Sequence, residues 1–140
     1  MGVKYHAFKQ LLPAVVRAGC VACLAFGYAL SVSPNTYAQT EDAGRRQFLT
    51  SCGTCHTAEP GGRHRQGPNL HGIFGKRAGQ VENFKYSDAL ARADLVWDEP
   101  TLDKWLEDSG AMLPGTVMAY RQRDPEKRRL VIEYLKTLRD

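Results

Sequence analysis

Two cysteines and a histidine stand within five residues of one another near the middle of the chain. Cys52 and Cys55 are separated by two residues, and His56 follows the second cysteine directly. This C-x-x-C-H spacing is typical of covalent haem c attachment, because each thiol can form a thioether with a porphyrin vinyl group. The adjacent imidazole can then bind the iron. The motif therefore predicts one haem c, with a structural zinc site or a disulfide as the alternatives.

A second C-x-x-C pair provides a comparison within the same chain. Cys20 and Cys23 have the same spacing, but Leu24 follows them where the motif needs a histidine, and the surrounding residues are apolar. We interpret these cysteines as small hydrophobic residues of a targeting segment, with a lipidated cysteine as the alternative. No haem is expected there.

The first 38 residues have the organisation of a secretory signal peptide. Three basic residues precede an apolar run over 18–32, and the small residue Ala38 offers a cleavage site. The run is shorter than the roughly 20 residues of a membrane-spanning helix, which favours a cleaved signal peptide. An uncleaved anchor that includes flanking residues is the alternative. We expect a signal peptide over 1–38, a mature haem domain over 39–140 and a location in the bacterial periplasm, because haem c is attached after export.

Charge is distributed unevenly along the predicted mature domain. The whole chain has a formal net charge of +4, and three of its positive charges lie in the predicted signal segment. Residues 82–108 contain eight acidic and three basic side chains, whereas residues 121–139 contain seven basic and three acidic ones. Such asymmetry can orient a redox protein toward a partner, or it can reflect ordinary solvated helix faces. Nothing in the pattern indicates nucleic-acid binding, which requires clustered basic residues with interleaved aromatics.

Helical signals surround the motif, and no segment has the alternation typical of a strand. We expect helices over 43–50, 88–93 and 99–108. Asp42 should begin the first, Ser87 should begin the second, and Gly110 should end the third. The glycine-rich residues 57–80 are predicted to form a long ordered loop wrapped on the cofactor.

A last helix is predicted to begin at Asp124-Pro125. Five of its residues are apolar at helical spacing and should dock on Gly44 and Phe48 of the first helix. These residues are Leu130, Val131, Tyr134, Leu135 and Leu138.

Two methionines of the predicted mature domain are candidates for the other side of the iron. Met118 follows Pro114 and Gly115, which favour an irregular loop that can direct a thioether inward, whereas Met112 has apolar neighbours. Core packing is the alternative for either methionine. A histidine and a methionine together raise the iron potential and leave no open coordination position, which suits electron transfer rather than peroxide chemistry.

The residues from about Gly44 to Leu138 resemble the class I c-type cytochromes, the mitochondrial-like type shared with soluble bacterial periplasmic relatives. The resemblance implies an all-α cytochrome c fold of four or five helices, with long loops around one covalently bound haem. It also implies that His56 and Met118 are the two iron ligands. The motifs that carry it are Cys52-x-x-Cys55-His56, Gly67-Pro68-Asn69-Leu70-His71-Gly72, Tyr86, Trp97 and Pro114-Gly115-Thr116-x-Met118.

The resemblance implies roles for four further residues around the haem. The carbonyl of Pro68 should accept the second ring N–H of His56 and fix its tautomer. Tyr86 and Trp97 should donate to one haem propionate, and Thr116 should lie near the other. Without the resemblance, the two aromatic residues would be interpreted as ordinary core residues.

Three positions around the expected haem site depart from the family pattern. Lys76 stands where the family usually has an arginine beside the propionates, and a lysine lacks the bidentate fork of arginine. Trp105 replaces a tyrosine that reaches the methionine sulfur, and Leu90 replaces an asparagine that supports an internal water. Because both changes remove polar groups near Met118, the resemblance predicts no particular reduction potential.

We therefore expect a monomeric electron carrier that is not an enzyme. Its expected partners are membrane redox complexes, with a cytochrome bc-type donor and a terminal oxidase or reaction centre as acceptor. Mitochondrial forms carry lysines around the exposed haem edge, where this chain has Gly110, Ala111 and Val117. The strongly cationic docking face of those forms is therefore missing, and the sequence does not indicate which of these partners is preferred. The alternatives are a haem peroxidase or redox sensor with a labile Met118, and a membrane-tethered carrier.

Overall fold

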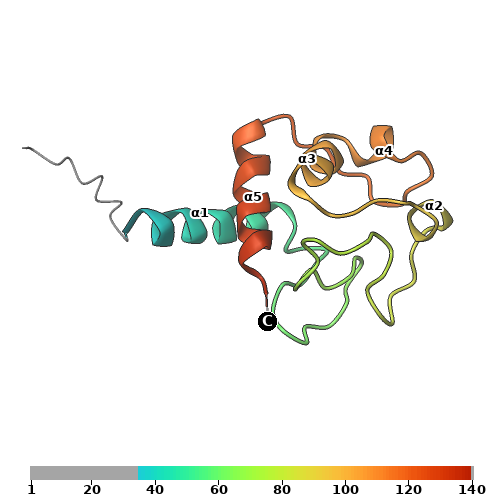
Figure 1. Cartoon of the computed structure of the whole chain (residues 1–140), viewed down its shortest axis with the longest axis horizontal. Helices are drawn as coiled ribbons and strands as arrows, with labels where there is room; N and C mark the ends of the chain where they lie inside the picture. The colour runs from blue at the N-terminus through green and yellow to red at the C-terminus, as the bar shows by residue number, and fades with distance from the viewer. Residues whose placement is uncertain (1–34, 140) are drawn as a thin grey trace, which may run out of the picture. The chain divides into compact units, whose positions relative to one another are not determined.

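The computed structural model describes residues 35–139, which form five helices joined by long loops (Figure 1). The helices are α1 (Asn35–Ser51), α2 (Asp88–Ala91), α3 (Glu99–Glu107), α4 (Ser109–Met112) and α5 (Pro125–Thr137). Over these residues the only extended pairing is an isolated antiparallel bridge between Arg77 and Val96. The predicted all-α fold is therefore confirmed. Residues 1–34 of the predicted signal segment lie outside the described residues.

Helix α2 is a single short turn that Ser87 caps as predicted. The Ser87 side chain accepts a hydrogen bond from the Leu90 amide at 3.4 Å, and the helix ends at Ala91 rather than at the predicted residue 93.

Between residues 35 and 139 no helix combines the length and the apolar character needed to cross a membrane.

Helix α1 is longer than the sequence predicts. It begins at Asn35, so Asp42 lies inside the helix, where it forms an ion pair with Arg46 one turn later. No glycine or proline interrupts residues 35–43, and the backbone can therefore stay helical through Asp42. The prediction of Asp42 as a cap was wrong. The predicted cleavage position after Ala38 falls within α1.

Helices α1 and α5 cross at close range, as predicted (Figure 1). A Cβ atom added to Gly44 would lie 2.7 Å from the Leu130 carbonyl oxygen and 3.0 Å from Tyr134 Cβ, so only glycine permits this approach. One turn later the rings of Phe48 and Tyr134 pack with their centroids 5.3 Å apart. The crossing places the end of α1, and with it the C-x-x-C-H motif, against the core.

The predicted apolar stripe of α5 forms much of that core. Val131 and Leu135 are buried, and Tyr134 and Leu138 pack at the edge of the cluster. Ile132, which lies off the predicted stripe, is buried as well.

The start of α5 is held by a buried arginine that sequence analysis did not single out. The Arg128 guanidinium donates two hydrogen bonds to the Asp103 carboxylate of α3, at 2.7 and 3.3 Å, and one to the Gln122 carbonyl at 2.9 Å. Asp124 caps the helix by accepting from the Glu126 amide at 2.9 Å. Helices α3 and α5 are thereby fixed to each other.

Helix α3 begins as predicted and ends earlier than predicted. The side chain of Asp98 caps it by accepting from the Thr101 amide at 2.9 Å. At Asp108 the backbone becomes extended, and the Asp108 carboxylate accepts from the Ala111 amide at 3.0 Å, which starts α4. Gly110 lies inside α4, so its predicted role as the end of the preceding helix was wrong.

The loop between α1 and α2 is held by hydrogen bonds between its own turns. The buried Asn69 amide group donates to Thr57 Oγ1 and to the Glu59 carbonyl, both at 2.9 Å. The Asn69 backbone amide donates to His64 Nδ1 at 3.0 Å, while His64 Nε2 bonds the Glu82 carbonyl at 2.9 Å. These bonds explain how a glycine-rich segment becomes the ordered loop that the sequence predicts.

Candidate haem-binding site

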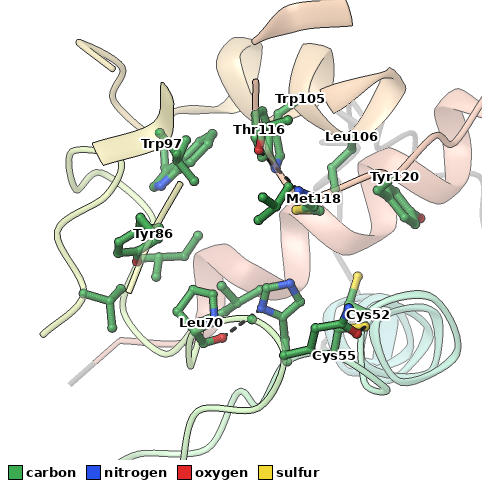
Figure 2. A pocket seen from close by; sticks show the side chains of 18 of the residues that line it. Cys52, Cys55, Leu70, Tyr86, Trp97, Trp105, Leu106, Thr116, Met118 and Tyr120 are labelled. Atoms are coloured by element: carbon green, nitrogen blue, oxygen red, sulfur yellow. Dashed lines mark hydrogen bonds between the residues drawn. The ribbon is translucent and has the colours of Figure 1, made fainter. Parts of the chain in front are cut away.

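The helices and loops enclose a cavity of about 380 Å³ (Figure 2). Its volume lies within the range of roughly 300–1,000 Å³ that is usual for cofactor and ligand sites. The cavity brings together all eight residues that the sequence singles out: Cys52, Cys55, His56, Pro68, Tyr86, Trp97, Thr116 and Met118. Met112, the rejected candidate ligand, is not among the lining residues.

His56 lies on a turn that directly follows α1. Its backbone amide bonds the Cys52 carbonyl at 2.9 Å, which continues the helical geometry by one turn and fixes the side chain at the cavity wall. The His56 Nδ1 atom lies 2.8 Å from the Pro68 carbonyl oxygen. Because a carbonyl can only accept, Nδ1 must carry the proton in this bond, and Nε2 keeps its lone pair.

Two effects set the protonation of the His56 ring. Burial lowers the pKa of His56, and the hydrogen bond to Pro68 opposes this shift. The imidazole is therefore neutral at neutral pH, the form in which its second nitrogen can bind a metal.

Gly67 shapes the space around that ring. A Cβ atom at Gly67 would lie 2.2 Å from His56 Cε1, so the backbone of the loop can approach the imidazole only without a side chain. Gly67 belongs to the Gly67–Gly72 motif, but the sequence alone does not predict this close approach.

The two cysteines of the motif line the cavity as free thiols, not joined to each other. Burial, together with the neighbouring Cys55, raises the pKa of Cys52 to about 12. The Cys55 thiol lies 3.2 Å from Gln66 Oε1. Within residues 35–139 there is no group of three or more His, Cys, Asp or Glu residues suited to zinc. Neither the disulfide nor the zinc alternative is present in this part of the chain.

Met118 reaches the cavity from the loop between α4 and α5. Figure 2 shows it on the opposite side of the cavity from Cys52 and Cys55, below Trp105 and Thr116. Its backbone amide donates to Thr116 Oγ1 at 3.4 Å, and its carbonyl accepts from Ser109 Oγ at 2.5 Å. The cavity therefore has an imidazole on one wall and a thioether on another.

One end of the cavity is more polar. Tyr86 and Trp97 line both the main cavity and a second one of about 230 Å³, which Lys76 and Arg77 also line. Burial raises the pKa of Tyr86, opposed by a hydrogen bond with the Val81 backbone. The phenol of Tyr86 and the indole of Trp97 thus face both cavities, and the cationic Lys76 and Arg77 line the second one, a combination that favours the binding of carboxylates.

The walls near Met118 are apolar at the positions that depart from the family pattern. Trp105 and Leu90 both line the cavity and are buried. The Trp105 ring packs against Trp97 with centroids 5.3 Å apart. Neither the Trp105 nor the Leu90 side chain carries a hydroxyl or an amide group.

These features together fit haem c. The donor set combines two thiols, one neutral imidazole and one thioether around an apolar space, and such donors suit a haem iron and its thioether links. Among the described residues, no side-chain nitrogen or oxygen that is fully shielded from solvent lacks a hydrogen-bond partner, so the protein around the cavity is fully hydrogen-bonded.

Comparison with known proteins gives the same result. Residues 41–139 match the family model described as Cytochrome c. The chain is 42% identical over 90 residues to cytochrome c of Kluyveromyces lactis, covering 64% of this chain and 82% of the yeast protein. It is 43% identical over 92 residues to cytochrome c2 iso-2 of Magnetospirillum molischianum, covering 65% and 94%. It is 38% identical over 112 residues to cytochrome c2 of Rhodomicrobium vannielii, covering 79% and 90%. The chain belongs to the cytochrome c family, a family of electron carriers with covalently bound haem c.

Proposed function

We propose that this protein is a periplasmic one-electron carrier whose haem iron is held between His56 Nε2 and the Met118 sulfur. The observation that carries the proposal is the placement of these two groups on different walls of one cavity, with His56 oriented by the Pro68 carbonyl at 2.8 Å. Cys52 and Cys55 hold the porphyrin through thioethers.

Covalently bound haem c supplies an iron that takes up and releases one electron. The chain's own residues would hold that iron: Pro68 fixes the tautomer of His56, and the loop around Met118 holds the thioether inward. With a histidine and a methionine both bound, the iron would have no place for oxygen or peroxide, which favours a carrier over an enzyme. The apolar walls around Trp105 and Leu90 exclude water and limit the rearrangement that accompanies a change of iron charge.

Tyr86, Trp97 and Thr116 complete the site by hydrogen bonding the haem propionates. Lys76 contributes a positive charge to the neighbouring second cavity, which Tyr86 and Trp97 also line, without the bidentate geometry of an arginine. These groups stabilise the buried carboxylates, which are costly to transfer from water without partners.

The proposed partners are membrane redox complexes, a cytochrome bc-type donor and a terminal oxidase or reaction-centre acceptor. Two relatives are named cytochrome c2 and come from bacteria, which supports a bacterial carrier exported by the signal segment 1–38. Val117, next to Met118, is 84% exposed, and its apolar side chain offers a contact for a partner at the rim of the site.

The proposal is tested on the purified holoprotein. A redox titration should fit a single reversible one-electron step, and the ferrous protein at neutral pH should not bind carbon monoxide on mixing, because both axial positions are occupied. Rapid carbon monoxide binding would instead support the peroxidase or sensor alternative with a labile Met118. N-terminal sequencing of the periplasmic protein tests the location: a chain that begins near Gln39 excludes a retained anchor.

A further inference from the structure

The most deeply buried polar side chain near the proposed iron site belongs to a residue that no motif includes. Ser109 is 0% exposed, although it begins the short helix α4 next to Asp108, which is only half-buried. A hydroxyl group in such a place needs partners inside the protein, since water cannot supply them.

The partners of Ser109 lie on the far side of a loop. Its Oγ donates to the Met118 carbonyl at 2.5 Å and accepts from the Tyr120 amide at 3.1 Å, while its own amide donates to the Tyr120 carbonyl at 3.2 Å. Ser109 therefore joins the two ends of the segment 109–120, which contains Met118.

Two further contacts next to Ser109 also join the start of this segment to its end. The Gln122 amide donates to the Leu106 carbonyl at 2.9 Å, and Asp108 forms an ion pair with Arg121 at the surface. Of these contacts, only those of Ser109 reach the Met118 backbone. The other described bond at that residue, from the Met118 amide to Thr116 Oγ1, is long at 3.4 Å.

We propose that Ser109 is the positioning residue for Met118. Its hydroxyl closes the 109–120 loop and holds the backbone from which the thioether extends into the cavity. Without that hydroxyl, the Met118 carbonyl and the Tyr120 amide lose a buried partner, and the loop opens more often. The inference rests on the proposed ligation of the iron by Met118.

The test uses imidazole binding to the ferric holoprotein, because imidazole can bind only after the proposed sulfur ligand has left the iron. The variant Ser109→Ala should keep the near-infrared absorption band of sulfur–iron ligation. Its imidazole binding should be about tenfold faster, the factor that corresponds to one lost buried hydrogen bond.

Two control variants separate positioning from general destabilisation. Phe48→Leu loosens the packing of α1 on α5, away from the cavity lining, and Thr137→Ala removes a hydroxyl that donates to the Tyr134 carbonyl at 2.7 Å. Both should bind imidazole at the parent rate, even where denaturation shows a lower stability. The proposal is overturned if Ser109→Ala binds imidazole at the parent rate, or if Phe48→Leu at a similar loss of stability accelerates binding equally.

A measurement on the unaltered holoprotein needs no variant. Hydrogen exchange at the Tyr120 amide should be slow, because this amide is bonded to Ser109 Oγ and exchanges only when the loop opens. The opening rate obtained from exchange should be at least as high as the rate at which imidazole enters, since imidazole needs the same opening. Unprotected exchange at that amide would contradict the closure by Ser109. Failure of the proposed function is a different result: the parent protein would then lack the sulfur–iron band altogether.

Discussion

At the scale of single residues, the site depends on how closely the backbone approaches His56. The variant Gly67→Ala would place a methyl group 2.2 Å from His56 Cε1 and push the ring away from the Pro68 carbonyl. We expect the holoprotein to lose about 1–3 kcal/mol of unfolding free energy, measured by guanidinium denaturation.

Gly110→Ala is the matched control for that variant. The nearest atom to a Cβ at Gly110 is Asp108 Oδ1 at 3.7 Å, so the added methyl group fits and α4 should keep its stability. Equal losses in the two variants would mean that close approach to the imidazole is not the cause.

At the scale of helices, the buried Arg128 side chain should contribute to the free energy of unfolding. Arg128→Met keeps an apolar stem of similar length but leaves the Asp103 carboxylate and the Gln122 carbonyl without their donor. We expect a loss of about 1–2 kcal/mol in the free energy of unfolding, because the hydrogen bonds of a buried guanidinium are removed while the 43% exposed Asp103 carboxylate regains contact with water. Arg129→Met, next to it, removes an exposed pair with Glu126 and should cost less than about 1 kcal/mol. Similar losses in both variants would contradict the role of Arg128.

The helix caps give the fold a dependence on pH. Hydrogen bonds from the Thr101 hydroxyl and amide lower the pKa of Asp98 below its ordinary value of 3.8. A carboxylate with a lowered pKa stabilises the fold above the unfolded-state value, and this contribution disappears as pH falls through the folded-state value. Asp98→Ala should therefore be less stable than the parent at neutral pH, and the difference should shrink below about pH 3.8. Denaturation curves at several pH values measure it, with Asp94→Ala as control, and a difference that stays constant into acid would contradict the assignment.

Elements that depend on neighbours along the chain were predictable from sequence, and those that depend on distant contacts were not. Ser87 and Asp124 cap helices because they precede them directly, and the C-x-x-C-H motif places Cys52, Cys55 and His56 at one cavity wall. In contrast, Ser109 bonds residues 9 and 11 positions away, and Arg128 bonds Asp103, 25 positions away. No local pattern distinguishes these two residues from surface serines and arginines.

At the scale of the whole described domain, the charge asymmetry of the sequence is partly cancelled by pairing. The acidic segment 82–108 and the basic segment 121–139 form three ion pairs with each other: Asp108 with Arg121, Asp103 with Arg128, and Glu99 with Lys136. Charges joined in this way contribute little to a long-range dipole. We therefore expect electron transfer with membrane partners to depend only weakly on ionic strength. A rate that falls steeply with added salt would show that charge steering dominates.

The exposed rim provides a complementary prediction about partner docking. Val117→Glu places a charge on the apolar side chain beside Met118, and it should slow electron transfer to the partner without changing stability. Val96→Glu is the control, since Val96 is also exposed but does not line the cavity. Equal rates for both variants would exclude the rim around Val117 as the contact.

We propose that His56 and Met118 hold the iron from opposite sides, and the reduction potential of Met118→Ala is the decisive measurement. The variant should lose the sulfur–iron band, have a lower potential and bind carbon monoxide in the ferrous state, because a thioether ligand raises the potential and occupies a coordination position. Met112→Ala, which removes a methionine from outside the cavity lining, should leave all three properties unchanged. If Met118→Ala keeps the potential and the spectrum of the parent, the assignment of the iron ligands is wrong.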